Sequence, residues 1–128
     1  MAEMAHEADV LVVDDSEEVR DLAALLFEKL GLKLHAVPDV AAAKKWLSSM
    51  TPKLIIADIM MPDGNGLDFL KWARSQGSLE SVPFIVSSSL AEEETIQDAL
   101  ELGATDYIKK PLTLDALKSK LRRVLYKN

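Results

Sequence analysis

Acidic, hydroxyl and basic side chains follow four of the apolar runs in this 128-residue chain. In chain order they are Asp14 and Asp15, then Asp58, then Ser88, and finally Lys110. Three carboxylates with no histidine or cysteine beside them favour a hard cation, and Mg²⁺ is the first candidate. The set suits a phosphoryl group: a cation and a lysine would neutralise the phosphoryl oxygens while an aspartate attacks in line.

The acids can act together only if their strands are neighbours, because neighbouring strands lie roughly 4.8 Å apart. Two carboxylates about 4 Å apart, at an effective dielectric constant near 20, repel by about 4 kcal/mol. Such a cluster must bind a cation or take up protons. Each residue alone also has a simpler interpretation: the aspartates as helix-start or strand-end residues, Ser88 as a loop serine and Lys110 as a solvated turn residue. Their joint placement favours a site.

The apolar runs are short and rich in β-branched residues. Nearly continuous apolar character is typical of parallel strands that are buried on both faces. Ligands bind to such sheets at the carboxyl ends of the strands, which is where the polar residues fall. The predicted strands cover residues 10–13, 32–37, 54–57, 84–86 and 107–108.

Segments with helical spacing alternate with these runs. A serine, aspartate, asparagine or threonine can cap four of the helices, and three glutamates open the other. The predicted caps are Ser16, Asp39, Asn65 and Thr113, and the acidic start is Glu92, Glu93 and Glu94. Strict alternation of five strands and five helices predicts an α/β fold, with a parallel sheet covered by helices on both faces.

Composition limits the class of protein. A hydrophobic content of 48% can form one core, which we place at residues 9–127 after a loose tail at residues 1–8. The net charge of −6 argues against direct nucleic-acid binding and against a membrane surface. No cysteine is present, and neither a signal peptide nor a membrane-spanning run is apparent. We therefore expect a soluble, cytoplasmic protein.

Four motifs, in this order and at these spacings, resemble the receiver domains of response regulators in two-component signalling, including chemotaxis regulators. They are VLVVDD at residues 10–15, LIIADIMMPDGNG at 54–66, PFIVSS at 83–88 and GATDYIKKP at 103–111. The resemblance covers residues 9 to about 125. It implies a flavodoxin-like (βα)5 fold, doubly wound, with a five-stranded parallel sheet in the order 2-1-3-4-5.

The resemblance also implies roles for particular residues. Asp58 resembles the phosphoacceptor and Asp15 the direct Mg²⁺ ligand, while Asp14 would act mainly through metal-bound water. The main-chain carbonyl of Met60 would complete the coordination. Ser88 would bond a phosphoryl oxygen and Lys110 would pair with the phosphoryl group, with a cis bond expected between Lys110 and Pro111. Tyr107 matches the aromatic switch residue, although a half-buried strand aromatic is the simpler interpretation. Ser89 departs from the alanine or glycine that is usual after the serine, and its hydroxyl could alter reaction rates.

The predicted function is a phosphorylation-dependent switch rather than an enzyme. A histidine kinase or histidine phosphotransfer protein would supply the phosphoryl group, and an output partner or domain would respond. Opposite charges on the fourth and fifth helices could pair in a homodimer through the helix 4, strand 5 and helix 5 face, but two solvated faces are the simpler interpretation. Two alternatives are a phosphorylation-independent docking module and an enzyme on this fold. The complete polar set argues against the first, and the lack of a glycine-rich phosphate loop argues against the second.

Overall fold

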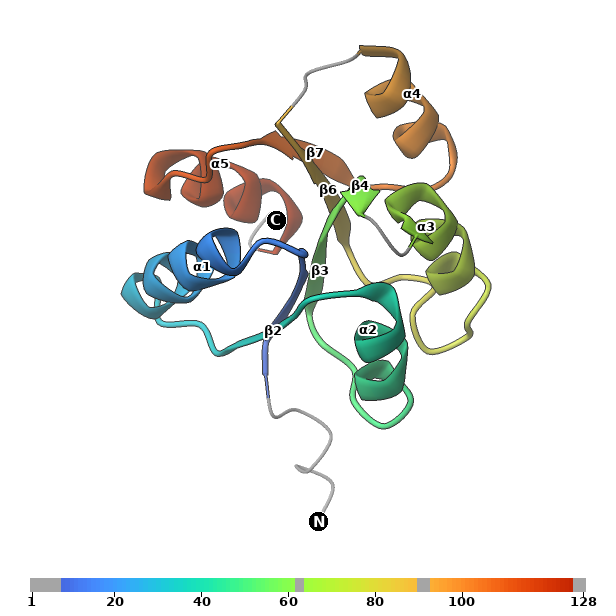
Figure 1. Ribbon diagram of the computed structural model, residues 1–128, viewed down its shortest axis with the longest axis horizontal. Helices are drawn as coiled ribbons and strands as arrows, with labels where there is room; N and C mark the ends of the chain where they lie inside the picture. The colour runs from blue at the N-terminus through green and yellow to red at the C-terminus, as the bar shows by residue number, and fades with distance from the viewer. Residues whose placement is uncertain (1–7, 62–63, 90–92, 126–128) are drawn as a thin grey trace.

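A five-stranded parallel sheet forms the centre of the protein (Figure 1), in a computed structural model that describes residues 8–61, 64–89 and 93–125. The strand order is β2-β1-β3-β6-β7. Counted along the chain, these five strands have the predicted order 2-1-3-4-5, so the predicted fold class is confirmed. The strands are β1 (Val10–Val13), β2 (Leu34–Val37), β3 (Leu54–Asp58), β6 (Phe84–Ser88) and β7 (Asp106–Lys109).

Helices cover both faces of this sheet, as Figure 1 shows. Leu11 and Val13 of β1 belong to the core on one face, whereas Val10 and Val12 belong to the core on the other. This double burial explains the uninterrupted apolar runs. No helix in the described ranges is long and apolar enough to cross a membrane. One face carries α1 (Glu17–Lys29) and α5 (Leu114–Val124); the other carries α2 (Val40–Leu47), α3 (Gly66–Arg74) and α4 (Glu93–Glu101).

Three of the predicted helix caps are confirmed. The side chains of Ser16, Asp39 and Thr113 accept hydrogen bonds from main-chain N–H groups three residues later, at 3.2, 2.8 and 3.1 Å. The side chain of Asn65, the fourth predicted cap, lies outside the described residues, as do Glu92, the side chain of Glu93 and the predicted tail up to residue 7. The sequence therefore placed the starts of α1, α2 and α5 correctly.

A second, two-stranded antiparallel sheet follows β3 and was not predicted. It pairs β4 (Met60–Met61) with β5 (Gly64–Asn65), in a segment for which the sequence predicted no strand. Strands of two residues are too short to show the period-2 alternation that identifies a strand. The predicted second strand also began two residues too early, because the structure starts it at Leu34.

Arg74, the last residue of α3, fastens this helix to two loops. Its guanidinium donates hydrogen bonds to the main-chain carbonyls of Leu79 (2.9 Å), Val82 (2.7 Å) and Gly103 (3.0 Å). Burial lowers the pKa of Arg74 from its usual value, so these carbonyls replace water around a charged group.

Arg74→Met is expected to lower the free energy of unfolding by roughly 1–3 kcal/mol, because it leaves partly buried carbonyls without a donor. Urea denaturation would measure the change. Lys71→Met is the matched control, since Lys71 is exposed on the same helix. Equal stability of the two variants would contradict a clamping role for Arg74.

Candidate functional site

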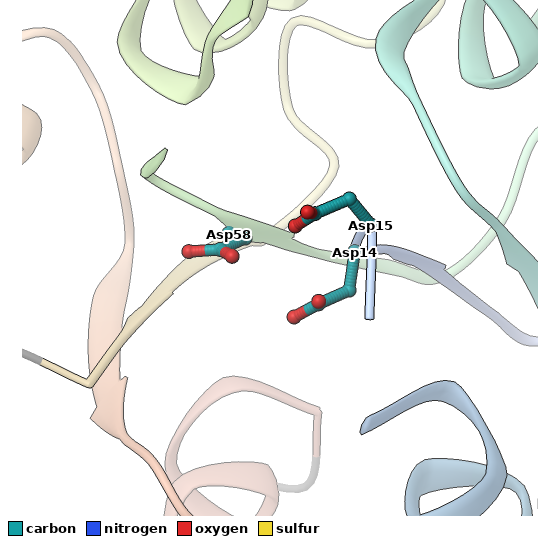
Figure 2. A group of neighbouring side chains, drawn as sticks. All are labelled: Asp14, Asp15 and Asp58. Carbon is teal, nitrogen blue, oxygen red and sulfur yellow. The ribbon is translucent and has the colours of Figure 1, made fainter. Parts of the chain in front are cut away.

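The three predicted acids lie together at the carboxyl edge of the sheet. Strands β1 and β3 are neighbours with Val13 opposite Ala57, so the residues that follow come side by side. One carboxylate oxygen from each of Asp14, Asp15 and Asp58 lies within 4.8 Å of the other two. Figure 2 shows the three carboxyl groups gathered at the ends of these strands.

The three acids differ in how far they are buried. Asp14 and Asp58 are only 1% and 7% exposed, whereas Asp15 is exposed. Burial raises the pKa of Asp58, because the charged carboxylate loses solvation; the hydrogen bond and charge of Lys110, and the main-chain N–H of Met60, partly oppose the rise. The ionised form of Asp58 is therefore held in a site that disfavours its charge.

Lys110 bridges the two buried acids. Its ammonium Nζ lies 2.7 Å from Asp14 Oδ2 and 2.9 Å from Asp58 Oδ2. Burial alone would lower the pKa of Lys110, but the two carboxylates outweigh it and the pKa is raised, so Lys110 stays charged. The Lys110 N–H donates to the carbonyl of Ser88 (2.9 Å), and the Lys110–Pro111 peptide is cis, as expected.

The loop after β1 is held by contacts that sequence reasoning missed. The Ser16 N–H donates to Asp14 Oδ1 at 2.9 Å, and the Arg20 guanidinium donates to the Asp14 carbonyl at 2.7 Å. Arg20 lies in the first turns of α1, and no motif singled it out. These bonds fix Asp14 and place a second positive charge beside the acids.

Asp58 is fixed from its C-terminal side. The Met60 N–H donates to Asp58 Oδ1 at 3.2 Å, so the Met60 main chain runs beside this carboxylate, while Met60 as a whole residue is 68% exposed. Gly66 packs against the same backbone, and a Cβ added to it would lie 2.2 Å from the Asp58 carbonyl oxygen. The sequence did not predict this contact, because a close approach between two backbone segments leaves no pattern in a single sequence.

Ser88 and Tyr107, the predicted switch pair, lie on adjacent strands. Ser88 ends β6 and pairs in register with Lys109 of β7, two residues after Tyr107. Both residues help line a cavity of about 10 Å³, the size of one water molecule. Tyr107 is 38% exposed as a whole residue, and Lys120 Nζ lies 4.6 Å from the centroid of its ring. In this structure the ring is thus partly at the surface, and Ser89 is exposed beside the strand end.

The charges of the site favour a bound cation. The three carboxylates outnumber the two positive groups beside them, Lys110 and Arg20, so the site keeps a net negative charge. Asp15 forms no ion pair with any residue in the described ranges, and all available donors are oxygens. Such a donor set fits Mg²⁺, which Asp14, Asp15 and Asp58 could hold.

Comparison with known proteins gives a consistent result. The family model described as the response regulator receiver domain matches residues 10–122. The phosphate regulon transcriptional regulatory protein PhoB of Klebsiella pneumoniae is 31% identical over 116 residues, which are 91% of this chain and 51% of PhoB. The regulatory protein AtoC of Escherichia coli is 34% identical over 91% of this chain and 25% of AtoC. The chain thus spans about half the length of PhoB and a quarter of the length of AtoC.

Solved structures show the same likeness. Chemotaxis protein CheY4 of Vibrio cholerae is 29% identical with a TM-score of 0.87, covering 92% of this chain and 98% of that one. The receiver domain of NtrX from Brucella abortus is 30% identical with a TM-score of 0.85, covering 94% and 100%. The signal receiver domain of a histidine kinase from Syntrophus aciditrophicus is 30% identical with a TM-score of 0.82, covering 93% and 90%.

Proposed function

Because the chain belongs to the response regulator receiver domain family, as found in two-component systems, we propose that Asp58 accepts a phosphoryl group from a phosphohistidine in a Mg²⁺-dependent reaction. The observation that carries this proposal is the cluster of three carboxylates, two of which, Asp14 and Asp58, are bridged by Lys110. A docking module without chemistry has no need for a buried, partly uncompensated charge cluster, which costs stability.

Strand order supports Asp58 as the acceptor over the other two acids. Strand β3 lies between β1 and β6, so Asp58 has the acid pair on one side and Ser88 on the other. Asp14 is 1% exposed, and its carbonyl and carboxylate already bind Arg20, Ser16 and Lys110. Asp58 is therefore the acid that lies between the possible cation ligands and the groups that could bind a phosphoryl group.

In the proposed reaction an oxygen of Asp58 attacks phosphorus in line as the phosphorus–nitrogen bond to the partner histidine breaks. An acyl phosphate forms on Asp58. Lys110 keeps its proton, and its ion pair moves from the Asp58 carboxylate to a phosphoryl oxygen. The Ser88 hydroxyl donates a hydrogen bond to another phosphoryl oxygen. Mg²⁺, when bound, would neutralise phosphoryl charge and lower the repulsion among the carboxylates.

The phosphoryl group would then act as a switch. By attracting Ser88 it would favour an inward Tyr107 within a pre-existing two-state equilibrium and change the surface of α4, β7 and α5. In this proposal the chain assists its own phosphorylation but turns over no other substrate. A histidine kinase or histidine phosphotransfer protein is the proposed donor, and an output protein or domain is the proposed recipient of the signal.

A homodimer through the α4, β7 and α5 face is not favoured by the charges of this structure. Asp106 pairs with Lys120 at 3.1 Å and with Arg123 at 3.8 Å within the chain. Two of the α5 cations that could pair with a second copy are thus already paired with Asp106. This supports the simpler interpretation, in which the exposed faces of α4 and α5 are solvated.

The test of the proposed function is incubation with acetyl phosphate and Mg²⁺, followed by intact-mass measurement. We expect the mass to increase by one phosphoryl group. When EDTA is present during the incubation to remove Mg²⁺, this increase should not appear. Beryllofluoride with Mg²⁺ should produce a corresponding spectral change. If neither modification nor change appears, the docking-module alternative is correct.

Mg²⁺ is also expected to stabilise the fold. At 100 times its dissociation constant it should raise the free energy of unfolding by about 2.7 kcal/mol. Asp15→Asn should lose most of this gain because Asp15 belongs to the carboxylate cluster. Asp21→Asn, an exposed acid on α1, is the control and should keep it. Urea denaturation with and without Mg²⁺ measures both, and an unchanged gain in Asp15→Asn would exclude Asp15 as a ligand.

A further inference from the structure

A groove between α1 and α5 lies away from the acid cluster. Its lining consists of Leu30, Leu32, Lys118, Leu121 and Arg122, and its volume is about 220 Å³. The two helices lie side by side on the same face of the sheet (Figure 1). The floor is therefore aliphatic and the rim carries two cations.

The groove lies toward the amino ends of the strands, whereas the acid cluster lies at their carboxyl ends. Leu30 is the C-cap of α1, and Leu32 comes just before β2, so both lie at the amino ends of the parallel strands. Asp14 and Asp58 lie at the carboxyl ends of β1 and β3. A molecule bound in the groove would not contact Asp58.

The cations at the rim are the ones that α5 leaves unpaired. Lys120 and Arg123 form ion pairs with Asp106. Lys118 and Arg122 are exposed and form no ion pair within the described ranges. In a chain with a net charge of −6, this is a local positive patch beside an apolar floor.

We propose that this groove docks an acidic amphipathic helix of a partner protein, independently of the proposed phosphorylation of Asp58. One or two aliphatic side chains of the partner enter the floor, and its Asp or Glu side chains pair with Lys118 and Arg122. The volume of about 220 Å³ is below the roughly 300–1,000 Å³ of pockets that enclose a small molecule. It suits the side chains of a larger partner, as in helix-in-groove recognition.

The charge and the apolar floor of the groove favour an acidic amphipathic helix over a nucleic acid. Nucleic acid binding uses many phosphate contacts on a basic surface, whereas the groove offers two cations on an acidic chain. A phosphate backbone would also leave the floor formed by Leu30, Leu32 and Leu121 uncovered. Acidic and aliphatic groups on one helix face satisfy both parts of the groove.

The probe is a fluorescein-labelled synthetic helix of about 14 residues, four turns long, with leucine on one face and glutamate on both flanks. Fluorescence anisotropy at about 0.1 M salt measures its binding, because that ionic strength screens remote charges beyond about 10 Å. We expect saturable binding below about 1 mM. A matched peptide with lysine in place of glutamate, and one with serine in place of leucine, should each bind at least about 10-fold more weakly.

On the protein, the double variant Lys118→Glu, Arg122→Glu should weaken binding at least about 10-fold, and the milder Lys118→Gln, Arg122→Gln by an intermediate factor. Circular dichroism would verify that α5 is retained. Lys71→Glu, a lysine exposed on α3, is the matched control and should bind as wild type. Asp58→Asn should also bind normally, which separates this proposal from the proposed phosphorylation.

Three results would overturn the proposal. They are no saturable peptide binding, equal binding of the lysine peptide, and unchanged binding to the double charge-reversed variant. Binding to vesicles that contain phosphatidylserine tests whether the groove recognises a membrane surface instead. If they bind the wild type but not the double variant, while the peptide does not bind, the patch recognises a membrane surface and not a helix.

Discussion

Replacing Asp58 with asparagine should abolish Mg²⁺-dependent phosphorylation while making the folded chain more stable at neutral pH. The amide is not a nucleophile, so labelling by acetyl phosphate should fall at least about 100-fold. The same change removes a charge that the site disfavours, because burial raises the pKa of Asp58. Loss of reaction together with a gain in stability would show that the loss does not come from unfolding.

The sign of the stability change follows from proton linkage. A carboxyl whose pKa is higher in the folded than in the unfolded state stabilises the fold at low pH. That contribution is complete below the unfolded pKa, near 3.8, and is lost as the pH rises through the folded pKa. At neutral pH the charge of Asp58 therefore lowers stability. Asparagine avoids this cost, and its amide oxygen can still accept the Met60 N–H, while Lys110 keeps Asp14 as a partner.

We expect Asp58→Asn to raise the free energy of unfolding at neutral pH, and this advantage should be lost as the pH falls through the raised folded pKa of Asp58 to the unfolded value near 3.8. Urea denaturation at about pH 7.5 and at about pH 3.5 would measure both values. Asp21→Asn serves as the control for removal of an exposed negative charge. Labelling of Asp58→Asn at the wild-type level would place the phosphoacceptor elsewhere. A variant less stable than wild type at neutral pH would mean that the Lys110 ion pair outweighs the cost of burial.

The sheet and the position of the acids could be predicted because both depend on local pattern. Strands buried on both faces require continuous apolar runs, and these runs mark β1, β3 and β6. In a parallel sheet every strand ends at the same edge, so residues that follow neighbouring strands must converge. The meeting of Asp14 with Asp58 follows from these two facts.

The way the site is held together could not be predicted. The residues implied for phosphoryl binding did include Lys110, but not its bridge between Asp14 and Asp58. The bond from Arg20 to the Asp14 carbonyl depends on a rotamer and on the tilt of α1. Such contacts are tertiary and leave no periodic trace. The same holds for the contact between Gly66 and the backbone of Asp58.

Gly66→Ala should destabilise the fold by about 3 kcal/mol or more, although helix propensity alone predicts the opposite sign. Gly66 is the first residue of α3, and within a helix alanine is favoured over glycine by up to about 1 kcal/mol. The added Cβ, however, would lie 2.2 Å from the Asp58 carbonyl oxygen and 2.8 Å from the Ile59 Cα. Both atoms belong to the backbone, so no side chain can rotate away and α3 or the end of β3 must shift.

The same shift should slow phosphorylation, because it displaces the main chain that carries Asp58. It would also disturb the hydrogen bond from the Gly66 N–H to the Ile59 carbonyl, now 2.8 Å long. Gly77→Ala is the matched control: a Cβ there meets no atom within 4 Å, so its effect should stay within about 1 kcal/mol and tend toward stabilisation. Urea denaturation and acetyl phosphate labelling of both variants would measure the two effects. If Gly66→Ala were as stable and as reactive as Gly77→Ala, α3 could move away from β3 at little cost. The close packing of Gly66 would then not be what positions Asp58.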